Sequence, residues 1–107
     1  MSRSSLNPAP VFAALGDSVR LELVSKLSHG EQRSITQLAD GMSLTRQGVT
    51  KHLHVLCEAG VVSQEQVGRE KRFAIVPDSI AEAQNYLSRA SAQWDAAIAR
   101  LKSKVER

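Results

Sequence analysis

Cysteine, aromatic residues and long apolar runs are all scarce in this sequence of 107 residues. The single cysteine, Cys57, excludes an intramolecular disulfide, and aromatics make up only 4% of the residues, so a core must rest on Leu, Val, Ile and Ala. That composition suits helices packed on helices more than a large β-sandwich. No apolar stretch approaches the roughly 20 residues of a membrane span, and Met1–Asn7 is polar, unlike a signal peptide. We therefore expect a soluble, cytoplasmic chain that does not bind membranes.

The usual motifs of catalysis and metal binding are also missing. The sequence holds no nucleophile elbow, phosphate-binding loop or convincing acid–base pair, so we expect no enzyme. Thiolate or imidazole metal sites need several ligands at close spacing, and residues 36–42 and 77–107 contain neither Cys nor His. We predict no cofactor and no bound metal. One alternative stays open, a metal- or thiol-responsive sensor that uses Cys57 or another site, although a lone cysteine is more often a small core filler.

Positive charge is concentrated in the middle of the chain. The formal net charge is +3, and the segment Thr45–Phe73 holds five Lys or Arg residues against three acidic ones. A basic segment is compatible with nucleic-acid binding but does not establish it. The arrangement of these residues is therefore the more useful evidence.

Capping and breaking residues divide the chain into short elements. Pro8 suits the first turn of a short helix, Gly16 breaks that helix, and Asp17 is a good N-cap for a second one. Thr36 and Thr45 are the expected caps of the next two helices. We expect flexible residues at 1–7, helices at 8–15 and 18–27, a brief strand or extended lead-in at 33–35, helices at 36–42 and 45–59, strands at 61–67 and 71–76, and a helix from 77 onward.

Two short helices joined by a tight turn and followed by a hairpin make a winged helix-turn-helix. The fold class predicted is mainly α with a small β-hairpin. Residues 8–107 are expected to form one such domain, with a C-terminal dimerisation helix at about 78–106.

The helix that begins at Thr45 has two distinct faces. At about 100° per residue, Val49, Leu53 and Leu56 form a buried stripe. His52 falls toward this buried side, where a structural role is expected. The opposite face offers an amide, a hydroxyl, an ammonium and an imidazole, which can bond base edges or phosphates. These outward residues are Gln47, Thr50, Lys51 and His54, and we include Thr45 and Arg46 at the start of the helix among the predicted DNA contacts.

Gly48 and the hairpin each allow two interpretations. A glycine inside a helix costs roughly 1 kcal/mol relative to Ala, so Gly48 either permits a close approach of the partner helix or the DNA, or is a tolerated weak spot. Arg69, Lys71 and Arg72 cluster around the hairpin turn, where they either form a solvated tip or contact phosphates and the minor groove. Beside a recognition helix, we favour DNA contact for all three.

Several segments together resemble the ArsR/SmtB family of bacterial regulators. The resemblance is carried by LTRQGVTKHL at 44–53, LCEAGVV at 56–62, LGDSVR at 15–20 and GREKRF at 68–73. Ser43 stands where the family often has Gly. The resemblance implies a homodimeric repressor that docks one recognition helix per subunit in the major groove of a double-stranded operator and releases it on a signal, through an inducer that the sequence does not identify. The run that begins at Trp94-Asp95 is similar to a subgroup without metal sites.

The last helix carries an apolar seam. Its apolar residues follow a 4-3-4-3-4 spacing, which is typical of helix-to-helix association. The seam either covers the domain's own core or forms a dimer, and its length favours a dimer shared with the helix that begins at Pro8. The predicted dimer contacts are Val11, Phe12, Leu15, Leu87, Ala90, Trp94, Ala97 and Leu101. A winged helix used only for protein–protein contact remains the other alternative to DNA binding.

Overall fold

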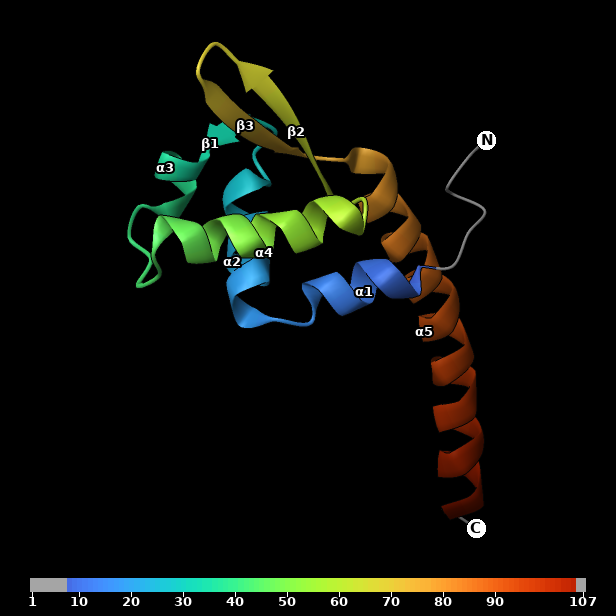
Figure 1. The fold of residues 1–107 in the computed structure, drawn as a ribbon. Helices are drawn as coiled ribbons and strands as arrows, with labels where there is room; N and C mark the ends of the chain where they lie inside the picture. The colour runs from blue at the N-terminus through green and yellow to red at the C-terminus, as the bar shows by residue number, and fades with distance from the viewer. Residues whose placement is uncertain (1–7, 106–107) are drawn as a thin grey trace.

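The computed structural model describes residues 8–105 and has the expected order of elements (Figure 1). The flexible segment predicted at 1–7 and the final residues of the predicted C-terminal helix lie outside the described residues. The elements are α1 (Ala9–Leu15), α2 (Ser18–Leu27), β1 (Arg33–Ser34), α3 (Ile35–Ala39), α4 (Arg46–Glu58), β2 (Val62–Val67), β3 (Glu70–Ile75) and α5 (Pro77–Val105). The predicted mainly helical, winged helix-turn-helix architecture is confirmed.

Side-chain caps fix the starts of two long helices where the sequence placed them. The Asp17 carboxylate accepts the backbone N–H of Arg20 at 3.0 Å, and this bond is the main reason that the pKa of Asp17 is lowered. The Thr45 hydroxyl accepts the backbone N–H of Gly48 at 3.0 Å. Each cap satisfies a donor that would otherwise be unpaired in the first turn of its helix.

The predicted cap of α3 was wrong. Ser34, not Thr36, begins this helix, and it forms a reciprocal capping box with Gln37. The Ser34 hydroxyl accepts the Gln37 N–H at 3.2 Å, while the Gln37 side-chain oxygen accepts the Ser34 N–H at 2.9 Å. The helix begins at the Ser-x-x-Gln pattern and not at Thr36, because this pattern satisfies two backbone donors reciprocally and a threonine cap would satisfy one. The helix is also shorter than expected and ends before Met42.

The wing is part of a three-stranded antiparallel sheet in the order β1-β3-β2. Phe73 of β3 pairs with Gln64 on one side and with Arg33 on the other. Of the two structures expected at 33–35, the brief strand is therefore the one that forms, as the third strand of the sheet. The pairing of Val67 with Glu70 leaves a two-residue turn, Gly68-Arg69, in which Gly68 has a φ of +63°. A positive φ suits glycine in such a turn.

The core lies where α1, α2, α3, α4 and the base of the sheet meet. Leu23, Leu27, Leu38, Leu53 and Leu56 are all completely buried in it. Gly60, with a φ of +80°, ends α4, and the bonds Gly60 N–H to Cys57 O and Val61 N–H to Leu56 O close the helix end. Such a glycine termination satisfies the last carbonyl groups of a helix.

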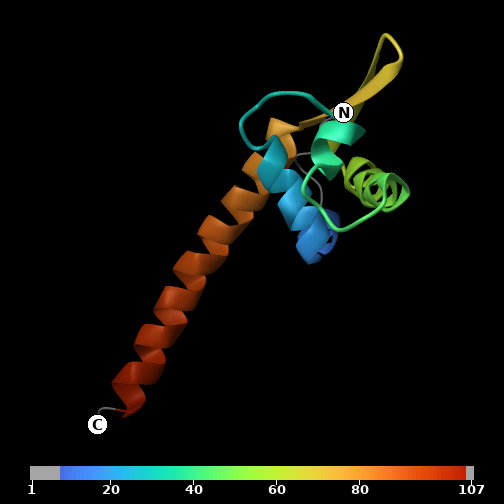
Figure 2. The same cartoon turned by 90° about the vertical axis from the view of Figure 1, so that its left-hand side faces the viewer.

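Helix α5 leaves this body and projects away from it. The Val76 N–H donates to the Val61 carbonyl oxygen at 2.9 Å, and the Ser79 hydroxyl donates to the Gly60 carbonyl oxygen, so the start of α5 is fixed to the end of α4. Figures 1 and 2 show that the wing and the far end of α5 extend in opposite directions from the helical body. Within residues 8–105, no helix has both the length and the apolarity that a bilayer span requires.

Candidate nucleic-acid interface

Helix α4 separates its side chains as its periodicity predicts. Val49, Leu53 and Leu56 are fully buried and hold the helix against the core. The side chains on the opposite face are all exposed; they are Gln47, Thr50, Lys51 and His54. This face therefore combines hydrogen-bonding groups with a positive charge on a surface that no other described element covers.

A polar hollow lies between the start of α4, the start of α3 and the wing. The residues that line it come from three separate parts of the sequence: Ser34, Ile35, Thr36, Arg46, Gln66, Arg69, Glu70 and Lys71. Figures 1 and 2 both show the wing leaning over this end of α4. The lining includes three cations, Arg46, Arg69 and Lys71, against one acid, Glu70. The resulting net positive charge favours the binding of an anion such as a phosphate group.

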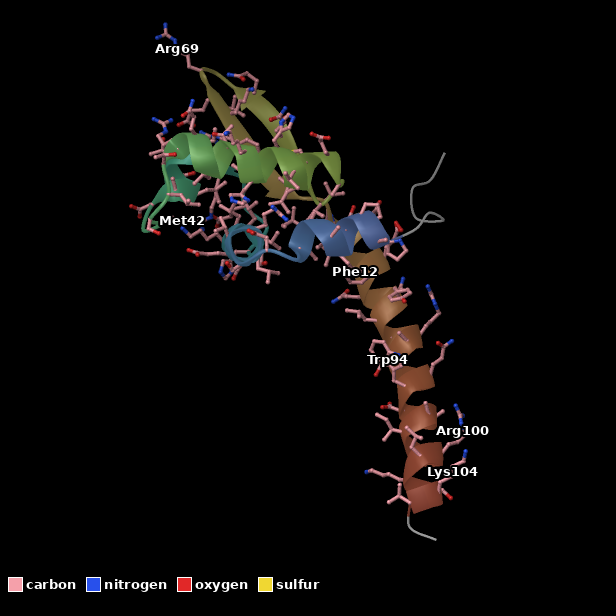
Figure 3. All side chains as sticks on the ribbon, turned by 60° about the horizontal axis from the view of Figure 1, so that its bottom comes forward. Phe12, Met42, Arg69, Trp94, Arg100 and Lys104 are labelled. Carbon is pink, nitrogen blue, oxygen red and sulfur yellow. The ribbon has the colours of Figure 1, made fainter. Side chains whose placement is uncertain are left out.

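The predicted wing residues do not all face this hollow. Side chains alternate between the two faces of a strand, so Lys71 shares the inner face with buried Phe73, whereas Arg72 lies on the outer face. There the Arg72 Nε lies 3.2 Å from the Glu70 carboxylate. Arg69 occupies the turn, and Figure 3 shows it at the far tip of the wing, pointing away from the body. The structure therefore brings Lys71 next to the start of α4, directs the Arg69 side chain outward from the tip of the wing, and leaves Arg72 paired with an acid.

Three of the predicted residues on α4 or at its cap already have local polar partners. The Thr45 hydroxyl accepts the cap bond described above, and the Thr50 hydroxyl donates to the Arg46 carbonyl oxygen at 2.8 Å. His54 Nε2 lies 3.3 Å from the Glu58 carboxylate, with both side chains more than 70% exposed. Gln47 and Lys51 are the exposed residues of this face whose polar atoms remain most available to a ligand, because neither has a side-chain bond within the described structure that competes for them.

Gly48 has room for a larger side chain. A Cβ atom there would lie 3.4 Å from the Thr45 hydroxyl oxygen and 3.7 Å from the Leu44 side chain, which are ordinary contact distances. No positive φ is required at this position. Packing against another helix of the chain therefore does not explain the glycine. The explanations that remain are close approach to DNA and tolerance of a weak helix position.

Much of the apolar seam of α5 is exposed. Leu87, Trp94, Ile98 and Leu101 are each about half or more exposed, at 47%, 58%, 50% and 62%. Figure 3 shows Trp94 on one side of α5, with Arg100 and Lys104 on the other. An apolar stripe of this length on a projecting helix is unusual for the surface of a monomer.

The other predicted dimer residues are placed differently. Val11 and Ala90 are buried within the chain, at 8% and 7% exposed, and leave little surface for a partner. Phe12 and Leu15 are half-buried, and the Phe12 ring packs against Tyr86 with centroids 5.7 Å apart. Tyr86 was missed in the sequence because it lies one residue before the seam position Leu87. Its spacing of three residues from Ala83 and four from Ala90, both buried, was the signal that could have placed it on the packed face.

Cys57 is half-buried against the core, and burial raises the pKa of its thiol. A raised pKa leaves less of the reactive thiolate, so this position gives no support to a thiol sensor. Across residues 8–105, no group of three or more His, Cys, Asp or Glu side chains is placed to hold a metal ion.

The sequence matches known regulators over this same region. The family described as a helix-turn-helix domain matches residues 15–65. An uncharacterised HTH-type transcriptional regulator from Bacillus subtilis is 35% identical over 69 residues, which cover 59% of this chain and 75% of the relative. A solved ArsR-like transcriptional regulator from Rhodococcus sp. RHA1 is 35% identical, with a TM-score of 0.72 and 90% of each chain covered. The chain belongs to the ArsR/SmtB family.

As an ArsR/SmtB family member, the chain is a transcriptional regulator with a helix-turn-helix DNA-binding domain, in which α3 and α4 form the helix-turn-helix and β2 and β3 the wing. A further relative is the HTH-type transcriptional repressor SmtB from Mycobacterium tuberculosis. It is 34% identical over 71 residues, which cover 66% of this chain and 52% of that one.

Five residues of the hollow were not among the predicted contacts: Ser34, Ile35, Thr36, Gln66 and Glu70. Thr36 is free of the capping role expected for it, and Gln66 pairs with Lys71 across the hairpin. The alternation of β2 was the signal that could have placed Gln66 on the same face as Lys71. The position of Thr36 in the hollow depends on the pairing of β1 with β3, which are far apart in the sequence, so local sequence does not reveal it.

Proposed function

We propose that this chain is a homodimeric repressor that reads a double-stranded operator with α4 and the wing of each protomer. The observation that carries the proposal is the position of the exposed face of α4 beside the cation-lined hollow. One surface thereby offers groups for base edges and groups for phosphates, the two kinds of contact that specific DNA binding requires.

The proposed contacts divide into two roles. Gln47 is the best candidate for reading a base, because a side-chain amide can bond an adenine edge with two hydrogen bonds. The proposed phosphate contacts are Thr45, Arg46, Thr50, Lys51, Arg69 and Lys71. We assign smaller roles to His54 and Arg72, since each would first have to leave its carboxylate partner, Glu58 or Glu70.

We propose that α5 supplies the dimer interface, with residues 8–107 acting as one unit and 78–106 as its dimerisation arm. The exposed seam provides the apolar surface. The first turns of α5 contain Asp78 and Glu82, whereas its last turns contain Arg100, Lys102 and Lys104. Two copies that pair antiparallel would therefore place opposite charges against each other, as well as opposite helix dipoles.

A two-fold dimer fits the proposed role as a repressor. Paired recognition helices read half-sites about one helical turn apart, at roughly 34–36 Å. A dimer on such a site covers enough duplex to exclude polymerase from an overlapping promoter. The relative SmtB is described as a repressor, and this chain shares its family.

The test is a selection of preferred sites from random-sequence duplexes, followed by sedimentation of the complex. The expected site contains two inverted half-sites centred about one helical turn apart, bound by two copies of the chain. A footprint on the DNA upstream of its own gene and reduced transcription from that promoter in vitro would support repression. Binding of a single copy to a site without symmetry would contradict the dimer, and failure to select any sequence would contradict specific DNA binding.

A further inference from the structure

The side of α4 that faces away from the proposed DNA surface carries a polar linkage. His52 lies there, half-buried, with its side chain 26% exposed. Its Nδ1 atom is 3.3 Å from the Nη1 atom of Arg20 in α2 and 3.7 Å from the carboxylate of Asp17, the cap of the same helix. His52 is thus the point at which α2 holds the recognition helix by a directional contact.

Arg20 is itself fixed at its other end. Its Nε donates to the carbonyl oxygen of Ala14, in the last turn of α1, at 2.5 Å. A guanidinium group presents its donors in a rigid planar fork, so two bonds from it fix an angle as well as a distance. Arg20 therefore joins three helices, α1, α2 and α4, through one planar group.

The contact with His52 requires a particular form of the imidazole. For Arg20 to donate, Nδ1 must present its lone pair, so the neutral ring carries its proton on Nε2. An acceptor atom at the Nδ1 position is what the linkage needs. The Asn side chain can place an amide oxygen close to that position, whereas Ala offers no acceptor.

The apolar contacts of α4 do not supply this constraint. Val49, Leu53 and Leu56 bury the helix, but hydrophobic contact is non-directional and tolerates small rotations of a helix about its axis. Base-edge contacts require side chains held within roughly 0.5 Å of their productive positions. His52 lies about 150° around the helix from the centre of the outward face, at about 100° per residue, so fixing it fixes the rotation of that face.

We propose that Arg20 is a positioning residue for DNA recognition, which holds the rotation of α4 through His52 and ties it to α1 through Ala14. The inference rests on the proposed DNA-binding function. Because α1 also packs on α5 through Phe12 and Tyr86, the linkage sets the orientation of the recognition helix relative to the proposed dimerisation arm. It therefore acts mainly on sequence preference, because a base contact needs a closely placed side chain, whereas the flexible Lys and Arg side chains and the wing can still reach phosphates after a small rotation.

A purely structural role predicts a different result. If Arg20 and His52 only stabilise the fold, their loss reduces the fraction of active protein, and affinity falls in proportion for every duplex. If they position α4, affinity for the preferred sequence falls while binding to other sequences, which phosphate contacts dominate, stays nearly constant. The ratio of the two affinities separates these roles.

The experiment uses the full chain, a duplex that the wild type has selected from a random library, and a scrambled duplex of the same composition. The variants are Arg20→Lys, His52→Ala and His52→Asn. The matched control is Arg33→Lys. The Arg33 Nε also donates to a helix carbonyl oxygen, that of Lys26, at 3.0 Å, but this bond joins β1 to α2 and does not involve α4.

Arg20→Lys and His52→Ala are expected to lower the affinity ratio about fivefold or more, the size typical of directly coupled residues. Their affinity for the scrambled duplex and its salt dependence should change less than about twofold, which is within the scatter of independent sites. His52→Asn should recover most of the ratio, and Arg33→Lys should keep it. A protein that carries both Arg20→Lys and His52→Ala should lose little more of the ratio than either single variant, because both substitutions break the same linkage. If Arg20→Lys is too unstable to assay, His52→Ala carries the test.

Two results would overturn the inference alone: a wild-type ratio in both Arg20→Lys and His52→Ala, or a proportional loss of affinity for both duplexes. A wild-type chain that selects no duplex would instead overturn the proposed function, and the inference with it. The outcome for the wild type thus distinguishes the two failures.

Discussion

Helices α4 and α5 are both amphipathic, yet they expose opposite faces. In α4 the apolar stripe is fully buried and the polar face is exposed, whereas in α5 beyond Ala83 the apolar seam is itself largely exposed. An exposed polar face is already stable in water, so it needs a partner only for function. An exposed apolar seam costs free energy until something covers it. The difference supports the proposal that α4 recognises DNA and that α5 mediates self-association.

The largest expected effect comes from placing a charge in the seam of α5. Leu101→Glu should convert the dimer to a monomer, because each copy would have to bury a carboxylate against apolar side chains. Affinity for the preferred duplex should fall about 100-fold or more, since two linked binding events become one. Sedimentation and a gel-shift titration measure the two effects.

The control for this variant is Ser103→Glu, which adds the same charge on the opposite side of α5. Ser103 is exposed and lies about 160° around the helix from Leu101. It should leave both the mass of the particle and its affinity unchanged. A Leu101→Glu protein that remains dimeric would show that the seam is not the interface.

The two faces of the wing give the next comparison. Lys71→Ala should weaken binding to every duplex and reduce the slope of log K against log salt by about 1 per lost phosphate contact. Arg72→Ala should do so to a smaller extent, because Arg72 is already paired with Glu70 on the outer face. Fluorescence anisotropy across a salt series measures both slopes. Equal losses from the two variants would contradict the division of the wing into two faces.

Gln47→Ala should change preference and not general affinity. Loss of the amide is expected to cost about 1–3 kcal/mol at one base pair of the preferred site and little elsewhere. Repeating the selection with this variant would reveal the relaxed position. Unchanged preference would remove Gln47 from the base-reading role.

The smallest effect is expected from Gly48→Ala. The added Cβ fits at ordinary contact distance, so the variant should raise the free energy of unfolding by roughly 1 kcal/mol through helix propensity. Thermal unfolding at fixed protein concentration measures this gain. If DNA affinity falls despite the gain, the glycine serves close approach to the duplex; if affinity holds, it is a tolerated weak position.

The local features of this molecule were predictable because they depend on neighbouring residues. Asp17 and Thr45 cap helices as expected, and the faces of α4 follow from its periodicity. The features that the sequence did not reveal join distant segments. Pairing of Arg33 with Phe73 completes the sheet, and Arg20 meets His52 across 32 residues. Val11 shows the same limit, since its apolar character did not say whether it faces the core or a partner.

The salt dependence of DNA affinity tests the central claim most directly. Wild-type chain is titrated against its selected duplex from low to moderate salt, beside the variant Lys51→Ala/Lys71→Ala. Lys51 is included because it is the exposed cation at the middle of α4. Log K should fall steeply and linearly with log salt for the wild type and less steeply for the variant, because counterions are released wherever lysines meet phosphates. A flat wild-type slope, or equal slopes for the two proteins, would contradict DNA recognition by α4 and the wing.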